Sequence, residues 1–370
     1  MRTVSALISI IDELVSNAFD NHIKSCEAGY KLYIVQVDVD EQNNSVTVRN
    51  TGKGITANKH GGDPVAVKVF EAINSSDAYS EGRGNAFRAG QLGEGAKLAN
   101  MWSSRFQMET CNGKEVVKAE WACTDGHLED LQRRRQWYTI NKCAGCQQGT
   151  TITMYPNLEA FNINNLQDAS VTQIMENRCY ALQAHVGKPN GISDNRKLTP
   201  NLNHIAVSVC FNGKRLDYHH GVGSMKDVAR CFVKQTQKEP PIAAYRDPEA
   251  GIDIAIFKPD EEWKADEDLY VVNGVNALSG GAFLQKIRAL VVRSFAEKKD
   301  GLKTKLGSQD VHVDNQYRRD VLEGKVVVFM PCAVRNVVFD ADNKSYVTNM
   351  DEDYGLDAGN CEAMTKHHLM

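Results

Sequence analysis

The chain has 370 residues, of which 42% are hydrophobic and 24% charged, and its formal net charge is -4 at pH 7. This length is comfortable for two domains, and the composition is that of an ordinary globular protein. The negative balance excludes a protein whose whole surface binds nucleic acid, but it allows a local basic patch. Ten cysteines occur without a secretory signal or a stretch apolar enough to cross a membrane, so we expect an intracellular protein with reduced thiols.

Residues 4–21 show the clearest periodicity, and they predict a helix with a buried stripe. The apolar residues at helical spacing are Val4, Leu7, Ile8, Ile11, Leu14, Val15 and Ala18. Glu13, Asn17, Asp20 and Asn21 fall on another stripe of the same helix. Such oxygens can hold hydrated Mg²⁺ and orient a water molecule, because Mg²⁺ needs few protein ligands. Taken alone, the stripe is better explained as the solvated face of a core helix.

A second pattern follows at 31–39 and 45–49, where alternating residues predict a hairpin that leads into Asn50-Thr-Gly-Lys-Gly-Ile. Gly52 and Gly54 allow a tight bend and a close approach to a flat ligand. The Asn50 carboxamide can pair with the edge of an adenine base. By itself, the segment is better explained as a glycine turn leaving a sheet.

After a predicted helix at about 64–73, a polar, glycine-rich run from 79 to 90 is typical of a mobile lid. It ends in Gly90-Gln-Leu-Gly-Glu-Gly-Ala-Lys, where glycines give way to a helical pattern. Backbone N–H groups there, together with Lys97, form a natural phosphate cradle. The spacing differs from that of a Walker-type P-loop, so the loop alone is weak support.

The rest of the chain alternates between strand and helix patterns. The expected elements are strands between 106 and 154, a helix at 171–185, a strand pair joined at Asn212-Gly213, strands at 252–257, 269–272 and 325–330, and a helix at 282–296 followed by a Lys-rich loop. A polar segment at 235–241 ends in two prolines, so we place a domain boundary there. The predicted domains are 1–234 and 235–350, followed by a polar tail at 351–370.

Four motifs stand in the order and at the separations of a known family. They are Asp12-Glu13 through Asp20-Asn21, Asn50 through Ile55, Gly90 through Leu98, and Phe339 through Lys344. With them the sequence resembles the ATPase region of eukaryotic-type type II DNA topoisomerases, in the GHKL ATPase superfamily. The resemblance implies an α+β fold: a GHKL-type ATPase sandwich with helices on one face of a mixed sheet, followed by a smaller α/β transducer domain of ribosomal-S5-like type.

The resemblance also implies roles toward ATP and Mg²⁺. Glu13 would polarise the attacking water, Asn17 would ligate Mg²⁺, and Lys344 would neutralise charge on the γ-phosphate. Asn50 would meet the adenine, and Ser75 and Ser76 would contact the nucleotide from the lid. The further positions implied in nucleotide binding are Asp20, Asn21, Gly52, Gly54, Asp77, Gly90, Gln91, Leu92, Gly93, Glu94, Gly95, Ala96, Lys97, Thr150, Asp342 and Asn343.

Some positions depart from the family pattern. Gln91, Leu92 and Glu94 replace the Arg, Asn and Tyr of the phosphate loop, and Asp77 replaces an Asn. A lost cation and added carboxylates beside a polyphosphate should weaken nucleotide binding. The transducer's Gln-Thr-Lys reads Asp342-Asn343-Lys344, which keeps the lysine.

We interpret the chain as the ATP-binding and ATP-hydrolysing gate region of a type II DNA topoisomerase. It starts almost at the first motif and so lacks the family's N-terminal strap, and it ends before the cleavage module, so we do not expect it to cut DNA alone. The implied partners are duplex DNA and a second copy on ATP binding, and the implied location is the nucleus. Two alternatives remain: a stand-alone nucleotide-dependent interaction protein, and another GHKL member such as a chaperone or mismatch-repair ATPase.

Weaker signals have simpler explanations. Cys143 and Cys146 have the spacing of half a zinc site, but an exposed turn between strands explains them better. The run Arg133-Arg134-Arg135 is interpreted as a solvated turn, and His219-His220 and His367-His368 as surface histidines. Four lysines can either contact a DNA backbone or belong to a solvated loop: Lys298, Lys299, Lys303 and Lys305.

Overall fold

In the computed structural model the chain divides into two compact units, Met1–Cys179 with Asn201–Leu216, and Tyr180–Pro200 with Asp217–Met370. The residues that the structure describes are 2–60, 62–71, 95–122, 131–186, 206–216, 227, 243–247, 252–257, 269–272, 275–277, 281, 284–285, 303–306, 309–312 and 327–332. The boundary expected between residues 234 and 235 lies outside this set and stays a prediction.

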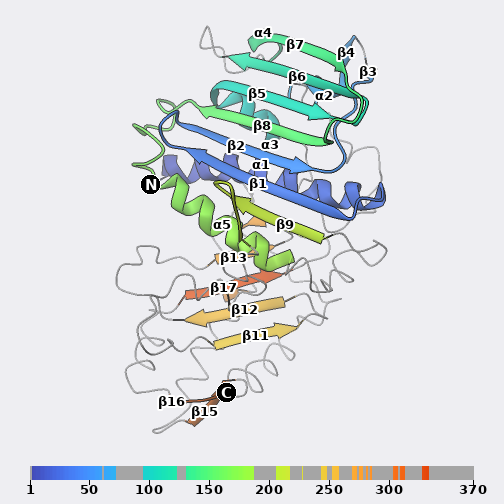
Figure 1. Ribbon diagram of the computed structural model, residues 1–370. Helices are drawn as coiled ribbons and strands as arrows, with labels where there is room; N and C mark the ends of the chain where they lie inside the picture. The colour runs from blue at the N-terminus through green and yellow to red at the C-terminus, as the bar shows by residue number, and fades with distance from the viewer. Residues whose placement is uncertain are drawn as a thin grey trace. The chain divides into compact units, whose positions relative to one another are not determined.

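The first unit is built on an eight-stranded sheet with the order β10-β9-β1-β2-β8-β5-β6-β7 (Figure 1). Its strands are β1 Leu32–Asp40, β2 Ser45–Thr51, β5 Ser103–Cys111, β6 Glu115–Ala122, β7 Arg135–Lys142, β8 Gly149–Pro156, β9 Ala206–Phe211 and β10 Lys214–Arg215. Only the pairing of β1 with β9 is parallel. The sheet is therefore mixed, as expected.

Helix α1, Arg2–Glu27, contacts strands β1, β2 and β8 and fills the centre of this unit. The predicted apolar stripe is buried from Leu7 to Ala18, whereas Glu13 and Asn17 are only half-buried. One face of the helix therefore forms core with the sheet, and the polar stripe borders that core. The prediction for this helix is confirmed, and the structure extends it at both ends.

Shorter elements surround the sheet. They are β3 Lys59–His60, β4 Asp63–Pro64, α2 Val65–Lys68, α3 Gly95–Met101, α4 Leu131–Arg134 and α5 Val171–Val186. The helix expected at 64–73 is shorter than predicted within the described residues, and β-branched Val65, Val67 and Val69 explain this by their low helix propensity. The turn expected at Asn212-Gly213 is confirmed, with positive φ at both residues. None of the described helices is long and apolar enough to span a membrane.

The arginine run at 133–135 is not the solvated turn that we expected. Arg134 is buried at the end of α4, and its guanidinium donates hydrogen bonds to the carbonyl oxygens of Asn100 (2.9 Å), Met101 (2.8 Å) and Ser103. Arg135 pairs at 3.2 Å with both Asp63 and Glu71. The guanidinium of Arg134 thus supplies the donors that the last carbonyls of α3 lack, which outweighs the cost of burying a charge.

The second unit contains a five-stranded sheet with the order β11-β12-β17-β13-β14. Its strands are β11 Ala243–Asp247, β12 Ile252–Phe257, β13 Leu269–Val272, β14 Val275–Asn276 and β17 Val327–Cys332. The expected bounds of β12 and β13 are confirmed. The expected loop around Lys303 and Lys305 is wrong at these two residues, because they lie in β15 (Lys303–Leu306), which pairs with β16 (Gln309–His312). Lys298 and Lys299 lie outside the described residues.

His22 on α1 makes the stability of the first unit depend on pH. Its ring is buried beside Phe19, and burial lowers the pKa of His22 from 6.5 to about 4. Between pH 6.5 and 4 the His22 side chain binds a proton in the unfolded chain but not in the native state. The free energy of unfolding should therefore fall as pH drops from 6.5 toward 4. We expect a loss of roughly 3 kcal/mol over this window, measured by denaturant unfolding at several pH values. His22→Phe should flatten this slope, and an unchanged slope would contradict the assignment.

Candidate functional site

Glu13 and Gly95 bring α1 and α3 together. A Cβ atom added to Gly95 would lie 2.3 Å from Glu13 Oε2 and 2.8 Å from Glu13 Cβ. Only glycine therefore fits at the first residue of α3, and the carboxylate lies against the point where the expected phosphate loop enters this helix. Two candidates separated by 82 positions in the sequence are thus in contact.

Lys97, another candidate, lies in α3 and is only 4% exposed. Arg134 holds the last carbonyls of the same helix. The short α3 is thus fixed at both ends, by the Glu13 contact at its first residue and by a buried guanidinium at its last turn. The run that contains Arg134 gave no sequence signal for this role, because consecutive arginines usually lie in solvent.

The glycine turn after β2 is attached to the C-terminal half of α1. Asn21 Nδ2 donates to the Lys53 carbonyl oxygen (2.9 Å), and the Lys53 N–H donates to Ser25 Oγ (2.9 Å). A Cβ atom on Gly52, whose φ is +99°, would lie 2.3 Å from Ser25 Oγ. The structure therefore assigns Asn21 to holding the turn, a contact that the sequence did not predict.

Tyr33 of β1 supports the same junction from the sheet. Its hydroxyl donates to the carbonyl oxygen of Ala18, in the middle of α1. Burial raises the pKa of Tyr33 well above its ordinary value, and the nearby charge of Asp20 acts in the same direction. The phenol therefore stays protonated and keeps donating across the neutral pH range.

Asn50 and Thr150 lie side by side at the end of the sheet. They are directly paired in the ladder between β2 and β8, and Thr150 is directly paired with Thr110 of β5. Asn50 is 6% exposed, and its Nδ2 donates to the Thr51 carbonyl oxygen (3.0 Å). A carboxamide fixed in this way presents a defined polar edge, which is what the recognition of a base requires. Thr110 was not among the predicted residues.

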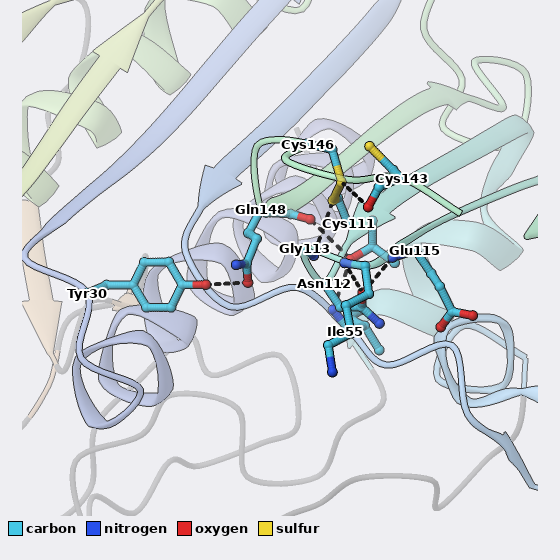
Figure 2. Close-up of a disulfide and its surroundings, with 12 residues drawn as sticks. Tyr30, Ile55, Cys111, Asn112, Gly113, Glu115, Cys143, Cys146 and Gln148 are labelled. Carbon is cyan, nitrogen blue, oxygen red and sulfur yellow. Dashed lines mark hydrogen bonds between the residues drawn. A yellow bond between two sulfur atoms is a disulfide. The ribbon is translucent and has the colours of Figure 1, made fainter. Parts of the chain in front are cut away.

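Gly54 packs against the backbone of β5. A Cβ atom at Gly54 would lie 2.0 Å from the carbonyl oxygen of Cys111, so no other residue fits there. Cys111 in turn forms a disulfide with Cys146, in the turn between β7 and β8 (Figure 2). The expectation that all thiols are reduced is wrong for this pair, because the fold brings together two cysteines 35 positions apart. The exposed turn expected around Cys143 is confirmed.

Two further contacts hold the turn that contains Cys146. The Tyr30 hydroxyl donates to Gln148 Oε1, as Figure 2 shows, and Arg49 Nη2 donates to Gln147 Oε1 (2.9 Å). Within the described part of the chain, no group of three or more His, Cys, Asp or Glu side chains is arranged to hold a metal ion. The disulfide, rather than zinc, accounts for Cys146.

Asp12, next to the catalytic candidate Glu13, forms a buried ion pair with Arg178 of α5. The side chain of Arg178 is 1% exposed and that of Asp12 is 10% exposed. The pair links positions 166 residues apart, and it fixes the face that α1 turns toward the core. Sequence reasoning placed Asp12 in a motif but could not identify its partner.

Comparison with known proteins finds a family that matches the first part of the chain. Residues 3–160 match the family described as "Histidine kinase-, DNA gyrase B-, and HSP90-like ATPase". The described residues of this segment have a GHKL-type ATPase fold. A domain of this fold implies nucleotide binding, and the half-buried polar stripe of α1 and the polar row at Asn50 and Thr150 are our candidates for the site.

Relatives of the whole chain are type II DNA topoisomerases. The chain is 26% identical to "DNA topoisomerase 2, mitochondrial" of Dictyostelium discoideum and 25% identical to DNA topoisomerase 2 of Drosophila melanogaster, over 93% and 95% of its length. These matches cover 24% and 22% of the two relatives, so the chain spans about a quarter of their length. The predicted resemblance to this family is confirmed, and the relatives favour it over a chaperone or mismatch-repair ATPase.

Solved structures give the same fold. The ATPase region of Saccharomyces cerevisiae topoisomerase II matches with a TM-score of 0.68 at 20% identity, covering 98% of this chain and 83% of that one. The ATPase and transducer domains of DNA topoisomerase II from Balamuthia mandrillaris match with a TM-score of 0.62 at 18% identity. The predicted sandwich of a mixed sheet and helices is therefore confirmed.

The structure brings Glu13 against Gly95 and Asn50 beside Thr150, and it holds the Gly52–Gly54 turn against α1 and β5. The other predicted positions of the lid, phosphate loop and transducer lie outside the described residues: Ser75, Ser76, Asp77, Gly90, Gln91, Leu92, Gly93, Glu94, Asp342, Asn343 and Lys344. Asn17 lies one helical turn after Glu13 on the half-buried stripe, where a carboxamide oxygen suits Mg²⁺. The residues present therefore fit a magnesium nucleotide.

Proposed function

We propose that this chain binds ATP with Mg²⁺ and hydrolyses it, as the ATP-operated gate region of a type II DNA topoisomerase. The observation that carries the proposal is the contact between Glu13 and Gly95. The carboxylate lies against the first residue of α3, where no side chain fits, and this contact supports our assignment of the preceding residues to a phosphate loop. Phosphoryl transfer to water needs positioning and charge stabilisation more than covalent help, and a fixed carboxylate supplies the positioning.

The described side chains divide the work in this proposal. We assign Glu13 to orienting the attacking water, and Asn17 and Lys97 to the phosphates, where Mg²⁺ would offset the negative charge. Asn50 and Thr150 bind the base, and the Gly52–Gly54 turn lets the backbone approach it closely. From the resemblance we retain Lys344 as the residue that neutralises the γ-phosphate, with Ser75, Ser76 and the loop 90–94 enclosing the nucleotide.

Duplex DNA and a second copy of the chain are the proposed partners, and the nucleus is the proposed location. The relatives of this chain are DNA topoisomerases, most of whose length it does not span. Strand passage is therefore proposed for a complete enzyme of this type, with ATP binding closing a dimeric gate. Lys303 and Lys305 on β15, with Lys298 and Lys299, remain proposed contacts to the DNA backbone.

Nucleotide binding by the purified chain tests the proposal directly. We expect Mg-ATP to bind, and Asn50→Ala to weaken this binding about tenfold, because deleting one partner of a buried hydrogen bond leaves the other unsatisfied. Isothermal titration calorimetry measures both affinities. Asn141→Ala, at an exposed position on β7, is the matched control and should bind ATP as the natural chain does. Absence of ATP binding at millimolar concentration would overturn the proposal.

A further inference from the structure

Thr110 closes a polar row across three neighbouring strands of the GHKL sheet. It lies directly opposite Thr150, which lies directly opposite Asn50. Directly opposed residues project from the same face of a sheet. That face is the buried one, because Val48, Ile152 and Met108, each two positions along its strand, are all buried. The row therefore forms the polar end of an otherwise apolar surface.

The hydroxyl of Thr110 has three partners. It accepts a hydrogen bond from the Ile55 N–H (2.9 Å), and it lies 2.9 Å from Thr150 Oγ1 and 3.1 Å from the Gly149 carbonyl oxygen. A threonine hydroxyl has one proton and two lone pairs. One lone pair accepts the hydrogen bond from the Ile55 N–H. The proton and the other lone pair are available for the Gly149 carbonyl oxygen and Thr150 Oγ1, both on β8. This single atom thus joins the glycine turn to the strand that carries Thr150.

In the proposed function, these two segments lie on either side of the base of ATP. The turn approaches from β2 through Gly52 and Gly54, and Thr150 stands beside Asn50. Thr110 itself is only 1% exposed, so it has no surface left for a ligand. Any effect that it has on binding must pass through the groups it holds.

We propose that Thr110 is a positioning residue of the base subsite, which sets the spacing between the Gly52–Ile55 turn and Thr150. This inference rests on the proposed function, because it takes the base of ATP as the ligand between these two segments. It predicts that loss of the Thr110 hydroxyl weakens the recognition of the base and leaves the recognition of the triphosphate unchanged. A residue that merely stabilised the fold would affect both equally.

The chain offers a matched control on the other face of the same sheet. Thr47 and Thr153 form a second cross-strand hydroxyl pair, 3.0 Å apart, between β2 and β8. Thr153 is three positions after Thr150 and therefore projects from the opposite face. Thr153→Val removes a hydroxyl of the same kind from the same strand, without touching the row at Asn50.

The test compares the affinity of each variant for ATP and for inorganic tripolyphosphate, which has no base. Competition against a fluorescent ATP analogue measures both. Thr110→Val should weaken ATP binding about tenfold and leave tripolyphosphate binding unchanged, because the Ile55 N–H and Thr150 lose a shared partner. Thr110→Ser keeps the hydroxyl and should restore ATP binding, and Thr153→Val should bind both ligands normally. Equal losses for both ligands, or no loss for ATP, would overturn the inference.

A measurement on the natural chain covers the case in which Thr110→Val does not fold. Amide hydrogen exchange at Ile55 should slow when ATP binds and should not change when tripolyphosphate binds. The reason is that only ATP has a base, which would contact and stabilise the turn that Thr110 holds. An exchange rate at Ile55 that does not change when ATP binds would contradict the inference. If the natural chain binds no ATP at all, the proposed function fails instead, so the two failures are distinguishable.

Discussion

Glu13→Gln should lower the rate of ATP hydrolysis by about 10²- to 10⁴-fold and leave the affinity for ATP within about twofold. Glutamine keeps the shape of the side chain against Gly95, so the packing of α1 on α3 is preserved. What it loses is the negative charge to which the proposed function assigns the orientation and polarisation of the water. Because the transition state of phosphoryl transfer is loose, the loss should appear in turnover rather than in binding.

The measurement for Glu13 combines a steady-state phosphate-release assay with calorimetric titration of Mg-ATP. Glu27→Gln is the matched control, since it makes the same change at the exposed end of α1 and should alter neither quantity. A Glu13→Gln variant that hydrolyses ATP at the natural rate would remove Glu13 from the mechanism. A variant that no longer binds ATP would show that the carboxylate serves the fold or the ligand instead.

Local pattern was enough to predict several of the regular elements that the structure describes. The apolar stripe of α1 repeats at helical spacing over several turns, and strands such as β12 are short apolar runs between polar segments. The turn at Asn212-Gly213 needs two residues that tolerate positive φ, and that pair is readable from the sequence. In these places the local preference and the tertiary structure agree.

The failures share a physical cause, which is that a distant partner decides the environment. Arg134 was expected in solvent, but its guanidinium donates hydrogen bonds to carbonyl oxygens of α3, more than thirty positions away in the sequence. Cysteine spacing does not reveal pairing, so the bond between Cys111 and Cys146 could not be predicted. β-Strand pairing likewise places Lys303 and Lys305 opposite residues of β16.

The same cause limits what the sequence reveals about the residues that support the candidate site. Glu13, Asn50 and Thr150 were identified through a resemblance between ordered motifs, and the structure brings Asn50 beside Thr150 and Glu13 beside Gly95. The supporting residues carry no motif. Thr110 is one of several threonines in alternating strands, and its role follows only from the register of β5 against β8.

Asp12 and Arg178 give the second large prediction, which concerns stability. Arg178→Met should lower the free energy of unfolding by about 3–5 kcal/mol, because it removes the cation from a buried ion pair and leaves the buried charge of Asp12 poorly compensated. Denaturant unfolding followed by circular dichroism measures this loss. Arg105→Met breaks an ion pair of 2.8 Å whose arginine side chain is 48% exposed, and it should cost less than about 1 kcal/mol.

A double variant separates the ion pair from the rest of the packing. In Asp12→Asn with Arg178→Met no buried charge is left alone, so the combined loss should be smaller than the sum of the two single losses. Additive losses would mean that the two side chains act independently, which contradicts a coupled pair. Because Asp12 directly precedes Glu13, we expect loss of the pair to disturb the orientation of Glu13 as well. The single variants should therefore reduce ATP hydrolysis even under conditions where the protein stays folded.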